Sequence, residues 1–180
     1  MTYNIEGYDP AAQGQTTWAT SKNMSVGGTL AVTGATTFTG AITQKPNFIS
    51  GSAATVTLTA AQSGSVALFD RAAGIIYTLP APAVGLYFDF ITTVTITTNN
   101  AEVATDAGTT FMQGSVRIAS AGTPNDFQGN GTSHLRVRSN GTTTGGVLGS
   151  GYRVTCVSTT LWNCNGLLQG SGVAAIPFLV

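Results

Sequence analysis

The segment from residue 26 to residue 43, VGGTLAVTGATTFTGAIT, alternates strictly between two kinds of side chain. Its even positions are apolar or glycine except for Thr36, and its odd positions are all glycine, alanine or threonine. A period of two places successive side chains on opposite faces, so the segment is predicted to be extended with one apolar face. Glycine also recurs every six residues, at Gly28, Gly34 and Gly40, and such repetition is typical of fibrous or arrayed proteins.

The apolar face of this segment needs a cover. Burying its large side chains contributes roughly 8 to 15 kcal/mol as an upper value, whereas ordering the chain costs on the order of 1 to 2 kcal/mol per residue. No helical pattern nearby offers a covering surface, so we expect the same face of identical chains to cover it. The stem side chains expected at this contact are Val26, Leu30, Val32, Phe38 and Ile42.

Composition favours an all-β protein. The chain has 7 Lys plus Arg and 7 Asp plus Glu, and its charged fraction of 8% is low against about 25% in typical proteins. Threonine and glycine abound while polar helix formers are scarce, which favours strands. The zero net charge argues against a nucleic-acid partner. No apolar run is long enough to cross a membrane and no signal peptide opens the sequence, so we expect neither a membrane protein nor an exported one.

Three parts of the chain differ in pattern. Residues 1–25 are polar and irregular with four spaced apolar anchors, and we interpret them as an arm that docks on a partner, the alternative being a disordered tail. Residues 26–50 are predicted to be the repetitive β stem and a linker, and residues 51–180 to be a head domain of β-strands. The anchors of the arm are Tyr3, Ile5, Tyr8 and Trp18.

Short alternating segments separated by turn residues follow in the head. Phe88 and Phe90 share a face with Leu86 and are expected in the core, with Asp89 on the opposite face. Residues 121–133 are expected to be a polar loop, and Asn140-Gly141 is interpreted as a hairpin turn. Residues 152–157 and 161–165 are expected to form a last hairpin, and the apolar tail 173–180 is expected to be tucked against the protein.

The stem sequence GGTLAVTGATTFTGAI resembles the repetitive β stems that precede head domains in tailed-phage fibre and spike proteins. The stretch TVTLTAAQSGSVALFDRAAGIIYTLPAPAVGLYFDF, with the Trp162 hairpin near the end, is similar to β-sandwich domains of phage virion proteins. Together they cover about residues 26–165. This resemblance implies a homotrimeric virion component with a jelly-roll-like head, assembled in the host cytoplasm.

Few residues offer catalytic chemistry. His134 is the one histidine, so a single chain has no multi-histidine metal site, and a Ser-His-Asp triad through it is not favoured. A carboxylate pair for glycoside cleavage would have to come from Asp89, or from Glu102 with Asp106, and solvated or ion-paired acids are the simpler interpretation. We therefore expect no enzyme, no cofactor and no metal.

Two further groups stand out. His134, Arg136 and Arg138 alternate along one strand and form either a solvated face or an ion-pairing surface that meets an acidic neighbour. Cys156 and Cys164 flank the last hairpin and could face each other across it. A reducing cytoplasm favours free thiols over a disulfide.

The function we expect is capsid decoration. A trimeric cement or head-fibre protein would bind the major capsid protein, or another virion protein, on the outer capsid surface. The main alternative is a short tail fibre or adhesin that binds host surface glycan. A depolymerase would need a carboxylate site between subunits, and a bacterial surface module would need an export signal.

Overall fold

The described part of the molecule is a two-layered β-sandwich. The computed structural model describes residues 35, 37, 41, 45–120 and 123–180, in which twelve strands and one 3-10 turn (η1, Ala60–Gln62) occur and no α-helix is found. The expected all-β class is confirmed. The sandwich belongs to a compact unit that spans residues 44–180.

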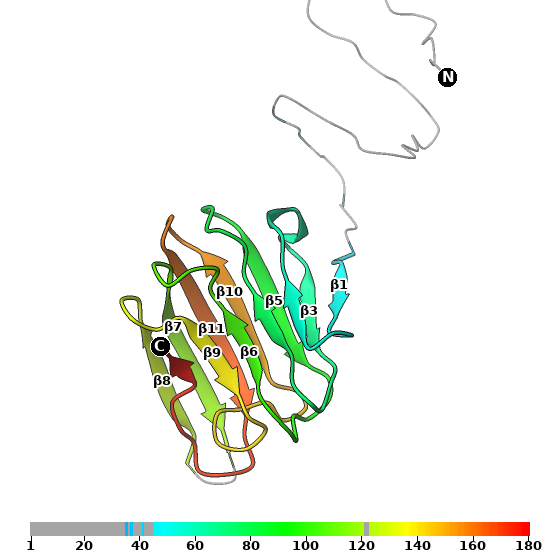
Figure 1. The fold of residues 1–180 in the computed structure, drawn as a ribbon, viewed down its shortest axis with the longest axis vertical. Coiled ribbons are helices and arrows are strands. Elements are labelled where there is room, and N and C mark those ends of the chain that lie inside the picture. The colour runs from blue at the N-terminus through cyan, green and yellow to red at the C-terminus, as the bar shows by residue number, and fades with distance from the viewer. Residues whose placement is uncertain (1–34, 36, 38–40, 42–44, 121–122) are drawn as a thin grey trace, which may run out of the picture. The chain divides into compact units, whose positions relative to one another are not determined.

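Seven strands form the larger sheet and five form the smaller one, and Figure 1 shows the sheets as two facing layers. The larger sheet has the strand order β1-β3-β5-β10-β11-β7-β8. Its strands are β1 Phe48–Ser50, β3 Val66–Phe69, β5 Tyr87–Thr92, β10 Gly151–Cys156, β11 Leu161–Gln169, β7 Phe111–Ala119 and β8 Asn125–Asn130. The smaller sheet has β12 Phe178–Leu179, β9 Arg136–Ser139, β6 Ala101–Ala104, β4 Ile76–Thr78 and β2 Thr55–Thr57, in that order.

Along the chain, the first six strands alternate between the two sheets. β1, β3 and β5 are neighbours in the larger sheet and β2, β4 and β6 in the smaller one, and all of these neighbours are parallel. A parallel pair needs a crossover connection, which is often a helix; here a strand of the facing sheet replaces it. A jelly roll is a double sheet built of Greek keys, whose strands are antiparallel. The β-sandwich is therefore observed, whereas these parallel pairs are not those of a jelly roll.

The core lies between the two sheets and is rich in aromatic rings. Phe90 of β5 packs edge-on against Tyr77 of β4 at 5.6 Å and stacks on Tyr152 of β10 at 5.4 Å between ring centroids. Phe88 and Phe90 are fully buried as the alternation predicts, and Asp89 points to the outside. The Tyr77 hydroxyl donates a 2.7 Å hydrogen bond to the Leu68 carbonyl, which ties the smaller sheet to the larger one.

Two sequence-based expectations for the head are wrong. Residues 121–133 are not simply a loop, because Asn125–Asn130 is strand β8, an edge strand paired with β7. Asn140-Gly141 does not close a two-residue hairpin, because β9 and β10 lie in different sheets. β1 lies before residue 51, where the head was expected to begin, and is part of the larger sheet.

The apolar tail is tucked in only in part, at Ala174, Pro177 and Phe178. Phe178 of β12 is buried against the core, whereas Ile176 and Val180 keep 46% and 73% of their surface exposed. Strand β12 consists of Phe178 and Leu179 alone, so Ile176 and Val180 lie outside it. No helix in the described part of the chain is long and apolar enough to cross a membrane.

Candidate functional site

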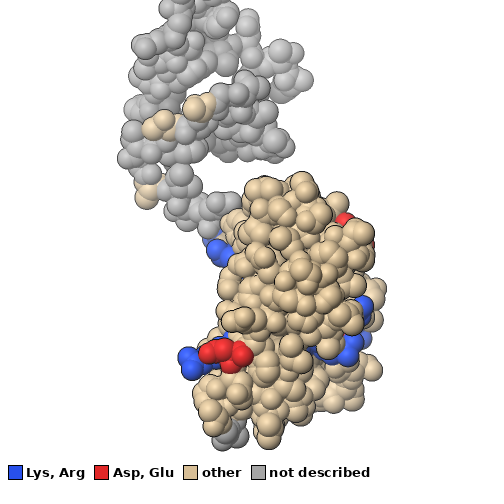
Figure 2. All heavy atoms as spheres, turned by 90° about the vertical axis from the view of Figure 1, so that its left-hand side faces the viewer, with Lys and Arg blue, Asp and Glu red and all other residues tan. Residues whose placement is uncertain are grey.

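Charged side chains are sparse, and most of those described are paired. On the side that faces the viewer in Figure 2 they form small separate groups on a largely uncharged surface. Glu102, Asp89 and Asp126 are each ion-paired with at least one arginine. The first two of these pairs are the candidate sites, because their acids are the less exposed: the Glu102 and Asp89 side chains are 6% and 28% exposed, against 69% for Asp126.

Glu102 accepts hydrogen bonds from two arginines on the outer face of the smaller sheet. Arg138 Nε lies 2.6 Å from one carboxylate oxygen and an Arg136 terminal nitrogen lies 3.4 Å from the other. The register of β6 and β9 places Glu102 opposite Arg138. The carboxylate is almost fully buried while both arginines are 36% exposed. Arg136 and Arg138 therefore pair with an acid of their own chain, which sequence reasoning did not anticipate.

His134 lies just before β9 and is separate from this ion pair. Its ring stacks on Phe178 at 5.7 Å between centroids, and its Nδ1 atom accepts a 3.1 Å hydrogen bond from the backbone N–H of Asn130. Both contacts are structural, since they fix the turn between β8 and β9 against β12. His134 therefore does not share a surface with Arg136 and Arg138 as expected: the histidine stacks on Phe178, and the two arginines bind Glu102.

Asp89 and Arg153 form the second site, on the outer face of the larger sheet. Arg153 Nε and its second terminal nitrogen donate to the two Asp89 oxygens at 2.7 and 2.8 Å, a bidentate geometry. This bond raises the pKa of the guanidinium above its ordinary value. The guanidinium also lies over the Tyr87 ring, 4.8 Å from its centroid. The three side chains hold one another in a fixed position.

Sequence reasoning did not single out Arg153. The only local signal is that Tyr152 and Val154 point inward, which turns Arg153 outward. Its partner lies 64 residues earlier in the chain, on a strand whose pairing with β10 no local pattern reveals.

Asp89 and Glu102 do not form a glycosidase-type pair. Asp89 lies on the outer face of the larger sheet and Glu102 on the outer face of the smaller sheet, so the core separates them. Asp106 follows β6 in an exposed turn. Within residues 45–120 and 123–180 no group of three His, Cys, Asp or Glu side chains could hold a metal ion.

Cys156 and Cys164 are buried free thiols. They do not face each other, because Cys156 lies opposite Trp162 and Cys164 lies opposite Val154. For the two cysteines to face each other, the hairpin would have to be centred midway between them in the sequence. The observed pairing centres it one residue earlier. Burial raises the pKa of both thiols, which keeps them protonated and unreactive at neutral pH.

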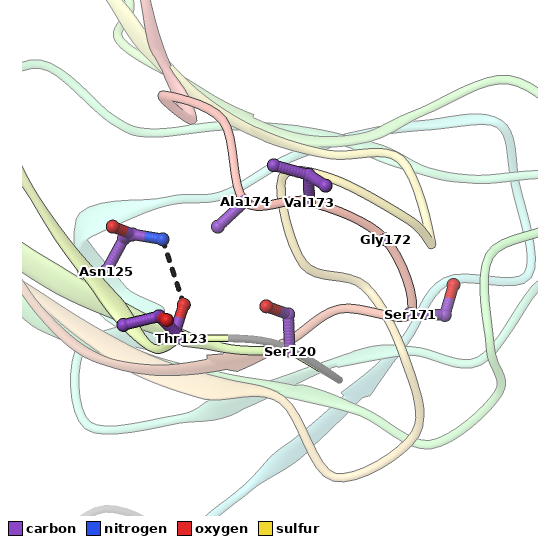
Figure 3. Close-up of a pocket in the computed structure, with 7 residues that line it drawn as sticks. All are labelled: Ser120, Thr123, Asn125, Ser171, Gly172, Val173 and Ala174. Carbon is purple, nitrogen blue, oxygen red and sulfur yellow. Dashed lines mark hydrogen bonds between the residues drawn. The ribbon is translucent and has the colours of Figure 1, made fainter.

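A cavity of about 370 Å³ opens beside the end of β7, and Figure 3 shows its lining. Asn125 and Thr123 on one side are joined by a 3.0 Å hydrogen bond from the amide to the Thr123 carbonyl. Val173 and Ala174 come from the segment before β12. None of these lining residues carries a charged side chain, so those named provide hydroxyl groups and one amide but no acid or base.

The expected arm and stem residues cannot be placed in the same way. Tyr3, Ile5, Tyr8 and Trp18 of the arm lie outside the described residues. The stem side chains Val26, Leu30, Val32, Phe38 and Ile42 lie outside them as well. Comparison with known proteins gives no match to a family model, a curated protein or a solved structure.

Proposed function

We propose that this protein is a structural component of a virion that decorates the outer capsid as a homotrimer. The observation that supports the proposal best is that residues 44–180 form a compact unit with a core of its own. Among the described residues, all side chains of this buried core lie between Leu58 and Phe178.

The alternation in residues 26–43 supports a role in self-association for the stem, and the spaced aromatics of residues 1–25 support a role in attachment. Three linked arms bind a repetitive surface with avidity gains of roughly 10² to 10⁴ over one arm. A capsid offers such a surface, because identical subunits meet at symmetry-related positions. The head is then displayed outward and its role is structural.

The trimer is tested by measuring the native mass with light scattering, for the unaltered protein and for two matched variants. Phe38→Asp places a charge on the apolar face of the stem and should weaken the trimer, because an unpaired buried charge is unfavourable. Thr37→Asp places the same charge on the polar face and should leave it intact. A monomeric unaltered protein, or equal behaviour of the two variants, contradicts this arrangement.

Capsid attachment is tested by co-sedimentation with capsids that lack the protein. The full chain should sediment with them, and a variant without residues 1–25 should stay in the supernatant. The variant Trp18→Ala should bind more weakly than the control Thr16→Ala. Binding to host cells or tail components instead of capsids would replace decoration by the adhesin function.

A further inference from the structure

The outer face of the larger sheet carries a straight row of side chains that spans all seven strands. The row begins at Phe48 on β1, which is 61% exposed. Strand register then carries it through Val66, Asp89, Arg153, Asn165, Ser115 and Gln128. With neighbouring strands about 4.8 Å apart, the row is about 29 Å long. It is therefore long enough to contact an extended ligand that lies across the strands.

Two hollows lie on this face, one on each side of Asp89 and Arg153. One has a volume of about 260 Å³ and is lined by Pro46, Gly64 and Tyr87. The other, of about 330 Å³, lies over Gly151 and Gly166. Val66, Asp89 and Arg153 line both hollows, so the bidentate pair forms a rigid polar ridge between them.

Gly151 creates the second hollow because it lacks a side chain at an outward position. Its strand partners are Ile91 on one side and Leu167 on the other, and they keep 39% and 47% of their surface exposed. A Cβ atom at Gly151 would meet only the Phe90 carbonyl oxygen, at 3.4 Å. The space is therefore open toward solvent and is not needed for packing of the strands.

The chemistry of the row favours a neutral, polyhydroxylated ligand. Arg153 is balanced by Asp89, and Arg117 is balanced by Asp126 at the far end of the face. Most of the other polar side chains of this face are amides and hydroxyls, which donate and accept hydrogen bonds without charge. They include Gln113, Ser115, Gln128, Asn130, Thr155, Asn163 and Asn165.

The exposed apolar groups lie at one end of the row and beside it, where they can contact the C–H faces of sugar rings. Phe48 is at the end and pairs with Val66 of the first hollow, whereas Ile91 lines the second hollow and Leu167 pairs with Gly151 beside it. A contact between copies of the chain would instead place apolar groups at its centre and charges at its rim. A phosphate or nucleic acid would need an unbalanced basic face.

From this arrangement we propose that the outer face of the larger sheet binds a neutral saccharide across β3, β5, β10 and β11. Asp89, Arg153 and Asn165 hydrogen-bond its hydroxyl groups, and the hollow at Gly151 receives a sugar ring. This site goes beyond capsid decoration, because it is independent of where the arm attaches.

The test is binding of the full-length protein to an array of neutral oligosaccharides built from hexoses, deoxyhexoses and N-acetylhexosamines, with sialylated and sulfated glycans beside them. Gly151→Val fills the hollow with a side chain that a strand accepts, and should lower affinity by about tenfold or more. Arg153→Ala should do the same by removing the ridge. Thr57→Val, on the outer face of the smaller sheet, is the matched control and should bind normally.

Thermal unfolding and light scattering of each variant accompany the array. The proposal is supported if neutral glycans bind and Gly151→Val lowers their affinity by about tenfold or more while the melting temperature and the native mass are unchanged. It is overturned if no neutral glycan binds, if only charged glycans bind, or if Gly151→Val binds neutral glycans with unchanged affinity. A change in native mass caused by Gly151→Val would show instead that copies of the chain cover this face. Capsid co-sedimentation of Gly151→Val should be normal, which separates this proposal from the decoration function.

Discussion

Arg138 of β9 lies opposite Glu102 of β6, and its Nε atom is 2.6 Å from a Glu102 carboxylate oxygen. The Glu102 carboxylate is almost fully buried, although it lies on the outer face of the smaller sheet. Arg136 contacts the second oxygen of the same carboxylate. Two half-exposed arginines therefore shield one acid, and the acid also screens the two arginines from each other. The three side chains are unequal in importance, because only Glu102 contacts both of the others.

Glu102→Ala should destabilise the protein more than Arg136→Ala. Loss of the acid leaves two neighbouring arginines unpaired, and we expect a decrease of about 1 to 3 kcal/mol in the free energy of unfolding. Loss of Arg136 leaves the shorter contact, between Arg138 and Glu102, intact, and it should lower the free energy of unfolding by less than about 1 kcal/mol. Urea unfolding of the two variants checks this order. Equal stabilities would show that the cluster acts as an ordinary surface ion pair.

Phe178→Ala should destabilise the sandwich by about 3 to 5 kcal/mol, because it empties a buried aromatic position of the core. Val180→Ala, two residues later, removes an exposed side chain and should change stability by less than about 0.5 kcal/mol. Thermal unfolding distinguishes the two. A tail that acts only as a free end would give two variants of the same melting temperature as the unaltered protein.

Asn140→Ala should loosen the loop between β9 and β10. The side-chain oxygen of Asn140 accepts hydrogen bonds from the backbone N–H groups of Thr142, Thr143 and Thr144, at 2.9, 2.8 and 3.1 Å. Their loss should cost about 1 to 2 kcal/mol. Asn125→Ala removes one exposed hydrogen bond and is the control. Hydrogen exchange should become faster at residues 142–144 in the first variant only, and unchanged protection there would refute the role of Asn140.

Alkaline pH should destabilise the protein. Burial raises the pKa of Tyr77, Tyr152 and Cys164 above the ordinary values of 10.0 for tyrosine and 9.0 for cysteine. Above those values the unfolded chain releases protons that the folded protein keeps, so the free energy of unfolding falls as pH rises. Urea unfolding between about pH 8 and pH 11 should show this decrease, and Tyr152→Phe should make the slope shallower. A free energy of unfolding that is constant over this range would contradict the burial of these groups.

Local alternation was enough to predict which side chains of a strand face the core. Phe88 and Phe90 point inward and Asp89 outward, as their spacing requires. Strand β8 was missed because only Phe127 on its inner face contacts the core, so its remaining residues have the composition of a loop. An edge strand with one solvated face and one free edge needs few apolar residues.

The pairing of strands was beyond local reasoning, and the candidate sites depend on it. Asp89 and Arg153 are 64 residues apart, and Glu102 and Arg138 are 36 apart. Each acid was recognised as a candidate by its type, but its partner is set by which strands become neighbours. Cys156 and Cys164 were expected to face each other, and they do not because the hairpin turn is shifted by one residue. Such a shift moves the residue opposite any given position by two.

The central claim, that the trimer stabilises a capsid through its arm, is tested most directly by the melting temperature of capsids measured by calorimetry. Capsids lacking the protein are mixed with the full chain or with the variant without residues 1–25. A ligand that binds only the assembled shell stabilises it by mass action, by about 2.7 kcal/mol per site at a concentration of 100 times the dissociation constant. We predict a higher melting temperature with the full chain and no change with the variant. An unchanged melting temperature with the full chain at saturating concentration would contradict the account.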